Sequence, residues 1–183
     1  GDAWPTFPAS DFGLTRQTVD FVGINYYTRA VVRHDPAQHP LRASPVRQPD
    51  RTYTETGWEV YEQGLVDTLT WFKDRYGNLP LYVTENGAAF HDPPVVEGEL
   101  LEDPLRVDYF RRHLKAVHAA IRAGVNVKGY YAWSLLDNLE WSLGFAKRFG
   151  LYHVDFTTQK RTPKASARFY ADVIASRGTA LAP

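Results

Sequence analysis

The sequence predicts an α/β fold with a parallel sheet, of the kind found in (β/α)8 barrels. Three β-prone segments recur along the chain, each followed by a helical segment, and this alternation gives a parallel sheet with helical cover. Residues 81–87 (LYVTENG) run from such a segment into Glu85 and a Gly-containing turn. Parallel α/β barrels display catalytic groups in this way, at the carboxyl ends of strands. Eight strands close a barrel, so three predict either part of a barrel or a small open sheet.

The first unit begins with an expected strand at residues 21–27 (FVGINYY), which is apolar with polar side chains at its end. A proline-rich stretch follows at about 34–56, and we expect a long loop there, because proline disfavours helices and inner strands. The helix after this loop is predicted over residues 61–76. Apolar side chains at helical spacing indicate it: Leu65, Leu69 and Phe72.

The second unit has its strand at residues 81–84, a proline- and acid-rich loop at 91–104, and a helix at about 105–123. One face of that helix is apolar, and Gly124 supplies its end. The third strand is expected at residues 127–134, where tyrosine and tryptophan are concentrated.

The last part of the chain is less regular. An irregular loop is expected at residues 135–150 and a short extra strand at 151–156. Thr162 and Pro163 are the predicted N-cap and first residue of a final helix that runs to about 174. No linker divides the chain, so residues 1–183 are expected to belong to a single barrel domain.

Composition excludes several classes of function. The 21 Lys and Arg residues balance 21 Asp and Glu residues, which argues against nucleic acid or an anionic membrane as a partner. No apolar run approaches the roughly 20 residues of a membrane-spanning helix, and no signal peptide opens the chain. The sequence has no cysteine, which excludes disulfides and thiolate metal sites and fits the cytoplasm, the expected location. Neither a cofactor nor a metal site is predicted.

The side chains at the strand ends suit the cleavage of a sugar. A retaining glycosidase needs an ionised carboxylate as nucleophile and a carboxylic acid that protonates the leaving oxygen. Glu85 ends the second strand, and Asn25 and Tyr27 at the end of the first can donate hydrogen bonds to it. The third strand brings Trp133, and its loop carries a Glu–Trp pair at 140–141, which offers a carboxylate for hydroxyls and a ring for a sugar face.

Five segments form a specific pattern when they are taken in order along the chain. They are residues 23–27 (GINYY), 57–61 (GWEVY), 82–87 (YVTENG), 132–141 (AWSLLDNLEW) and 148–155 (RFGLYHVD). The pattern resembles the C-terminal part of the family 1 glycoside hydrolases, the β-glucosidases. The resemblance covers nearly the whole chain and implies a retaining β-glycosidase, β-glucosidase-like, built on a (β/α)8 barrel.

The resemblance assigns a role to each residue at the strand ends. It implies that Glu85 is the nucleophile that forms the glycosyl-enzyme. Tyr27 would hydrogen-bond Glu85 and keep it charged and oriented, and Asn25 would lie in the same polar surroundings.

The same resemblance implies a binding site for the sugar that is cleaved off, the glycone. Trp133 would form the floor of that subsite, Glu140 and Trp141 would bind the hydroxyls at positions 4 and 6, and Phe149 would close its wall. Relatives that act on 6-phosphorylated sugars lack an acid where this chain has Glu140, because a carboxylate there repels phosphate. An unphosphorylated β-glycoside is therefore the expected substrate.

Part of the family's site is not found in the sequence. The family carries its acid/base Glu in an Asn-Glu-Pro motif, which does not occur here, and the Gln and His-Trp pair of the glycone site are not found either. We therefore expect this chain to form roughly strands six to eight of the barrel, with the N-terminal strands and the acid/base supplied from outside it. The expected partner is the N-terminal part of the barrel or a second copy of the chain.

Two alternatives remain at this stage. The chain could be a non-catalytic half-barrel that serves as a fragment or assembly module, or a remnant that binds sugar without turnover. Some polar residues have plainer readings as well: Glu59 as a hydrogen-bond partner in a loop, His153 as a structural histidine, and Asp137-Asn138 as a turn that aims Glu140.

Overall fold

The computed structural model describes residues 5–181. Its α-helices are α1 (Ala9–Thr15), α2 (Gln63–Tyr76), α3 (Pro104–Arg122) and α4 (Ala165–Ala175). Its strands are β1 (Val22–Asn25), β2 (Val32–His34), β3 (Ala43–Pro45), β4 (Leu81–Asn86), β5 (Val127–Ala132), β6 (Tyr152–Val154) and β7 (Arg161–Pro163). The 3-10 helices are η1 (Trp141–Leu143) and η2 (Thr179–Leu181).

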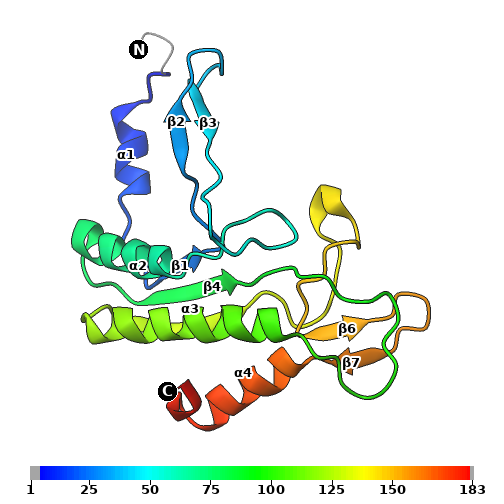
Figure 1. Ribbon diagram of the computed structural model, residues 1–183. Coiled ribbons are helices and arrows are strands. Elements are labelled where there is room, and N and C mark those ends of the chain that lie inside the picture. The colour runs from blue at the N-terminus through cyan, green and yellow to red at the C-terminus, as the bar shows by residue number, and fades with distance from the viewer. Residues whose placement is uncertain (1–4, 182–183) are drawn as a thin grey trace.

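A three-stranded parallel sheet in the order β1-β4-β5 forms the centre of the molecule (Figure 1). Val22 pairs with Leu81 at one end of the β1–β4 ladder, and Asn25 pairs with Glu85 at the other. The three predicted strand–helix units are therefore confirmed as neighbours in one parallel sheet. Because parallel strands share the edge at which their carboxyl ends meet, the residues that follow β1, β4 and β5 lie together.

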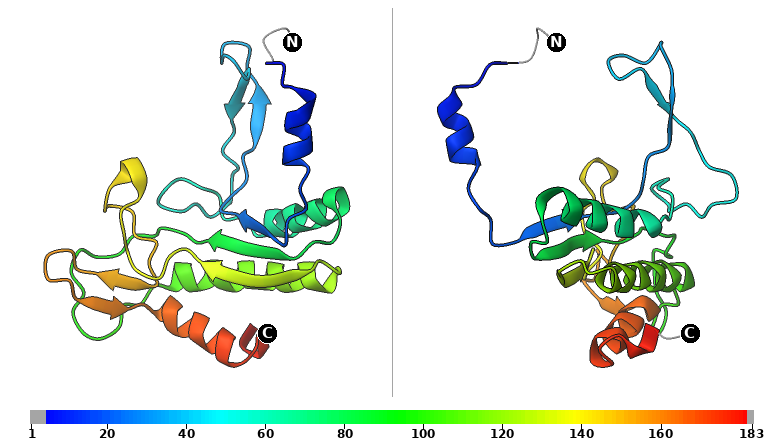
Figure 2. Two further views of the ribbon diagram at one scale, coloured as in Figure 1. Left: turned by 180° about the vertical axis from the view of Figure 1, so that it is seen from behind. Right: turned by 90° about the vertical axis from the view of Figure 1, so that its left-hand side faces the viewer.

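Helices α2 and α3 cover one face of this sheet, and in the view from behind β5 lies in front of α3 (Figure 2, left). Their apolar stripes meet the inward side chains of the strands, as the periodicity of both helices predicts. Helices on a single face are the arrangement found in the wall of a (β/α)8 barrel. The buried core comprises Tyr26, Leu65, Leu69, Leu81, Val83, Ala116, Val117, Ala120 and Val125.

A second core joins α3 to α4 and to the segment that follows β4. Its buried members are Val60, Ala88, Phe90, Tyr109, Phe110, Leu114, Leu151 and Val173. This core fixes residues 88–90, directly after the end of the Glu85 strand, against two helices. At 19 residues α3 is the longest helix described, yet no helix in residues 5–181 combines the length and apolar character needed to cross a membrane.

The proline-rich stretch contains structure that the sequence analysis did not predict. Within the expected loop at 34–56, β3 pairs antiparallel with β2. Helix α1, which precedes β1, was not predicted either. Both elements stand apart from the sheet (Figures 1 and 2), and α1 buries none of its residues. The loop prediction is wrong for 43–45, because proline is tolerated in an edge strand, where its missing N–H faces no partner.

The predicted start of the last helix is also wrong. Thr162 and Pro163 belong to β7, which pairs antiparallel with β6 through His153–Thr162 and Tyr152–Pro163. Helix α4 begins at Ala165 with Lys164 in the N-cap position. The same property of proline, its lack of an N–H donor, suits a first helical turn and a short edge strand equally, so the local sequence does not separate the two.

Candidate active site

The carboxyl ends of β1 and β4 bring Tyr27 and Glu85 into direct contact. The hydroxyl of Tyr27 donates a hydrogen bond of 2.7 Å to Oε2 of Glu85. The backbones are tied as well, since the N–H of Tyr26 donates to the Glu85 carbonyl across 2.9 Å. Two predicted site residues that are 58 positions apart in the sequence are thus brought together by the parallel pairing.

The surroundings of Tyr27 keep its phenol protonated. Burial raises the pKa of Tyr27 well above its ordinary value, and the hydrogen bond to Glu85 and the charges of Glu85 and Glu140 raise it further. A protonated phenol can donate a hydrogen bond to a carboxylate, so Tyr27 orients Oε2 of Glu85. The effect of Glu140 on the same pKa places its carboxylate within electrostatic reach of Tyr27.

Asn25 lies one strand away on the same exposed face of the sheet. Its Oδ1 accepts a hydrogen bond of 2.7 Å from the hydroxyl of Thr84, the residue before Glu85. This contact holds the Asn25 side chain beside the Glu85 strand.

Asn86 is a residue of the site that the sequence analysis missed. Its side chain has no exposed surface. Its Nδ2 donates to the Tyr26 carbonyl (2.7 Å) and to the Tyr109 hydroxyl (2.9 Å), and its Oδ1 accepts from the Tyr130 hydroxyl (2.6 Å). One amide therefore links β1, β4, β5 and α3 directly behind Glu85. The sequence feature that could have identified Asn86 is its amide side chain at the end of a buried strand, because a buried amide needs hydrogen-bond partners.

His113 lies beneath this network on α3. Its ring stacks on Tyr109 with centroids 4.0 Å apart, and its Nδ1 lies 2.8 Å from the Tyr109 carbonyl. Its Nε2 is buried without a hydrogen-bond partner among the described residues. Burial lowers the pKa of His113 to about 4, so the imidazole is neutral at ordinary pH.

Two aromatic rings pack against Tyr27, those of Trp58 and Phe149. Trp58 lies 5.2 Å from the Tyr27 ring centroid, and Phe149 meets the same ring edge-on at 6.2 Å. Trp58 and Phe149 are themselves 6.1 Å apart. Phe149 is only 2% exposed, so its ring supports Tyr27 from the protein side. Trp58 lies in one of the five segments of the sequence pattern, but the sequence analysis gave it no role.

The loop after β5 carries the other predicted residues. Trp133 donates its backbone N–H to the Asn86 carbonyl across 2.9 Å, which places it beside the Glu85 strand. At the tip of the loop, Glu140 accepts a backbone hydrogen bond from Leu143, and Trp141 is 87% exposed.

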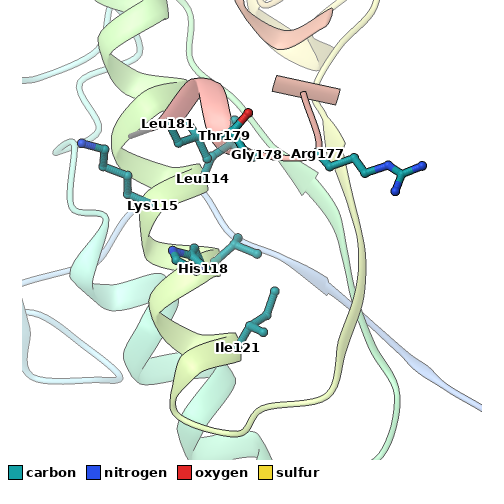
Figure 3. Close-up of a pocket in the computed structure, with 9 residues that line it drawn as sticks. Leu114, Lys115, His118, Ile121, Arg177, Gly178, Thr179 and Leu181 are labelled. Atoms are coloured by element: carbon teal, nitrogen blue, oxygen red, sulfur yellow. The ribbon is translucent and has the colours of Figure 1, made fainter. Parts of the chain in front are cut away.

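A cavity of about 660 Å³ lies elsewhere on the molecule, between the outer side of α3 and residues 177–181 (Figure 3). Its apolar lining includes Leu114, Ile121 and Leu181, and none of the predicted site residues lines it. The side chains of Lys115 and Arg177 extend away from it in opposite directions (Figure 3). Within residues 5–181 no cluster of His, Asp and Glu side chains is suited to hold a metal ion.

Comparison with known proteins decides the family. Residues 2–179 match the model described as glycosyl hydrolase family 1. The chain belongs to glycosyl hydrolase family 1. This membership confirms the resemblance carried by the five sequence segments.

Family 1 relatives match the chain over almost all of its length. It is 45% identical over 168 residues to a 1,4-beta-D-glucan glucohydrolase of Thermotoga neapolitana. The aligned residues cover 92% of this chain and 37% of that protein. The solved family 1 β-glucosidase from Thermotoga maritima superposes with a TM-score of 0.87 at 41% identity, over 92% of this chain and 38% of the other. The same enzyme in complex with isofagomine lactam gives a TM-score of 0.85 at 40% identity, over 92% and 37%.

The structural match identifies the fold of the chain. It is an α/β structure that matches part of a family 1 β-glucosidase barrel, and it spans less than two-fifths of the length of these relatives.

Proposed function

We propose that this chain carries the nucleophile and glycone subsite of a retaining β-glycosidase, β-glucosidase-like, in which Glu85 is the nucleophile. The observation that carries the proposal is the 2.7 Å hydrogen bond from Tyr27 to Glu85 at the carboxyl end of the sheet. Family membership adds weight, because the relatives of similar sequence are β-glucosidases and a glucan glucohydrolase.

The reaction is a double displacement. Oε2 of Glu85 is engaged by Tyr27, so Oε1 attacks the anomeric carbon of the bound sugar. The bond from that carbon to the aglycone oxygen breaks while an acid protonates the departing oxygen. A water molecule then attacks the same carbon, its proton passes to the conjugate base, and the Glu85 carboxylate is released.

The glycone subsite lies around this carboxylate. We assign Trp133 to its floor and Glu140 and Trp141 to the hydroxyls at positions 4 and 6. Phe149, which is only 2% exposed, backs the predicted wall by packing against Tyr27. Two observations support this: Glu140 is close enough to act on the pKa of Tyr27, and the Trp141 ring is exposed at the tip of its loop.

Asn25 belongs to the polar surroundings of Glu85. Its Oδ1 is held by Thr84, and we assign the N–H groups of its amide to the substrate. In this position they supply donors for a hydroxyl next to the reacting carbon.

The acid/base is supplied by residues outside these 183. We place the chain at roughly strands six to eight of the barrel, with the N-terminal strands as its partner, because the family's Asn-Glu-Pro motif does not occur in it. The open sheet edges at β1 and β5 support such a partner. General acid help contributes typically about 10²–10⁴-fold to such a reaction. A chain without that partner would therefore bind sugar and turn it over poorly.

The proposed substrate is an unphosphorylated β-glycoside. The carboxylate of Glu140 repels a phosphate at position 6. The family 1 β-glucosidase from Thermotoga maritima forms a complex with isofagomine lactam. A cytoplasmic location remains a prediction from the absence of cysteine.

The test uses the protein expressed from its complete gene. The sugar first released from a 4-nitrophenyl β-glucoside is followed by proton NMR, and retention predicts the β-anomer. Glu85→Ala should abolish hydrolysis, and added azide should restore turnover of this activated substrate and give the α-glycosyl azide, because azide attacks from the side where the carboxylate stood.

The matched control is Glu99→Gln, at an exposed acid in the loop before α3, which should keep full activity. An α-anomer as first product, or a β-glycosyl azide from Glu85→Ala, would overturn the assignment of Glu85. The second candidate, a half-barrel that binds sugar without turnover, predicts no hydrolysis by the whole protein and undiminished binding of isofagomine lactam.

A further inference from the structure

Six charged side chains are buried together behind the candidate site. They come from the segment after β4, from α3, from the loop after β5 and from the start of α4. Three are acidic and three are basic, and Lys164 and Arg106 have no exposed surface. The six are Asp92, Asp103, Arg106, Asp137, Arg148 and Lys164.

Lys164 joins two of these segments. Its ammonium group donates to Oδ2 of Asp92 across 2.6 Å and to Oδ1 of Asp137 across 2.9 Å. Its backbone N–H donates to the Leu151 carbonyl across 2.9 Å. We call Asp92, Lys164 and Asp137 the buried bridge.

One end of the buried bridge closes the base of the loop that carries Glu140, residues 135–150. Asp137 accepts the backbone N–H of Gly150 at 2.9 Å and that of Val154 at 3.2 Å. It also accepts a hydrogen bond of 2.8 Å from Arg148. The single carboxylate therefore ties the beginning of the loop to its end, and the segment between them, with Glu140 at its tip, projects from a fixed base.

The other end reaches the segment that follows Glu85. Asp92 is paired with Arg106 at 3.1 Å. The Arg106 guanidinium also donates to the Ala88 carbonyl at 3.2 Å and forms a 3.0 Å hydrogen bond to the Arg148 carbonyl. The backbone three residues beyond Glu85 and the backbone one residue before Phe149 are thus held by the same side chain.

The energetics favour a positioning role over a stabilising one. The desolvation free energy of the buried charges is about as large as their mutual electrostatic attraction. Apolar side chains of similar volume would therefore stabilise the fold equally well or better. Burial opposes the ionised form of Asp137, but Lys164 and Arg148 outweigh it and hold the pKa of Asp137 below its ordinary value. Buried ionic groups are best justified where they select one geometry among several.

We propose that the buried bridge is a positioning device, which sets the place of the Glu140 loop relative to Glu85 and so determines how the hydroxyl groups far from the cleaved bond are recognised. The inference rests on the proposed function, because it needs Glu140 to bind sugar. It adds Asp92, Lys164 and Asp137 as positioning residues that do not touch the substrate.

The test measures discrimination between two substrates by the protein expressed from its complete gene. These are 4-nitrophenyl β-glucoside and its 6-deoxy analogue, which lacks a hydroxyl assigned to Glu140. The charge-balanced variant D137N/K164M removes one acid and one base and leaves Asp92 paired with Arg106. We expect the ratio of the two kcat/KM values to fall about tenfold, with kcat/KM for the 6-deoxy substrate changed less than about twofold.

A matched control removes the same two charges nearby. D155N/K160M acts on the exposed turn between β6 and β7, where Asp155 accepts hydrogen bonds from residues 157 and 158, and it should leave the ratio unchanged. The melting temperature of each variant is measured in parallel. A D137N/K164M protein that melts lower but keeps the wild-type ratio would show that the bridge only stabilises the fold, and would overturn the inference.

Glu140→Ser separates this inference from the function on which it rests. If Glu140→Ser keeps the wild-type ratio, Glu140 does not bind the 6-hydroxyl, and the proposed subsite fails together with the inference. If Glu140→Ser lowers the ratio and D137N/K164M does not, only the inference fails.

Combining the changes sharpens the result. If the bridge acts through Glu140, E140S/D137N/K164M should lower the ratio no further than Glu140→Ser alone, and additive losses would contradict the inference. Should D137N/K164M not fold, Asp137→Asn decides by the same ratio, since it keeps the size of the side chain and leaves Lys164 paired with Asp92.

Discussion

Tyr27 and Glu85 share a 2.7 Å hydrogen bond across two neighbouring parallel strands, although they lie 58 positions apart in the sequence. The Tyr27 ring packs against both Trp58 and Phe149, so the hydroxyl has little freedom to move away from the carboxylate. The nucleophile proposed here is therefore oriented by a donor that the fold itself immobilises.

Removing the Tyr27 hydroxyl should slow catalysis while the fold persists. Tyr27→Phe keeps the ring contacts with Trp58 and Phe149 but leaves Oε2 of Glu85 without its donor. We expect kcat/KM to fall about 10²-fold, the usual effect of losing one aligned donor in an active site. The control is Tyr131→Phe, at a side chain that is 56% exposed; equal losses in the two variants would contradict the role given to Tyr27.

Replacing Glu140 should weaken binding of the natural substrate and allow substrates that carry a phosphate at position 6. Glu140→Ser removes the carboxylate that we propose accepts hydrogen bonds from two sugar hydroxyls, so KM for a β-glucoside should rise about tenfold or more. The same variant should gain activity on the 6-phosphate of that glucoside, because a like charge has been removed. The assignment of Glu140 is wrong if initial rates on both substrates equal those of the wild type.

Asn86 should contribute strongly to stability. Asn86→Ala leaves the Tyr26 carbonyl and the hydroxyls of Tyr109 and Tyr130 with a lost partner in a buried site. We expect the free energy of unfolding to fall by about 2–4 kcal/mol, measured by urea denaturation. Asn126→Ala, which removes a single long side-chain hydrogen bond of 3.4 Å, should cost well under half as much.

The buried His113 should make stability depend on pH in a defined window. The unfolded chain takes up a proton at this side chain below its ordinary pKa of 6.5, whereas the folded protein does so only below about 4. The unfolded state therefore binds more protons between these values, and stability falls as pH drops from about 6.5 to about 4. The shift corresponds to at most about 3 kcal/mol.

His113→Gln should flatten this dependence, because glutamine does not titrate. Melting temperatures recorded between pH 4 and pH 7 would follow it, with His118→Gln at an exposed position of the same helix as control. Parallel curves for wild type and His113→Gln would exclude His113 as the source of the pH dependence.

The sequence predicts those elements whose formation depends on residues close together in the chain. The β1, β4 and β5 strands and the α2 and α3 helices follow from local periodicity, and Glu85 was found because it ends an apolar strand before a Gly-containing turn. The contacts around Asn86 were not predictable, because its partners come from three other elements. The same holds for Lys164, whose partner Asp92 is 72 positions away.

Predictions were wrong where the local sequence is compatible with two kinds of secondary structure. Thr162-Pro163 reads equally well as the start of a helix and as an edge strand, and only the pairing with β6 decides between them. The β2–β3 hairpin was hidden by its prolines for a similar reason, since an edge strand tolerates them.

Covalent trapping tests the central claim most directly. A 2-deoxy-2-fluoro-β-glucoside with a good leaving group should form a glycosyl-enzyme that hydrolyses slowly, because the fluorine disfavours the positively charged transition state of both steps. Peptide mass spectrometry of the protein expressed from its complete gene should place the label on Glu85, and the label should disappear on prolonged incubation with water as activity returns. A label on any other carboxylate, or time-dependent inactivation that persists in Glu85→Ala, would contradict the account.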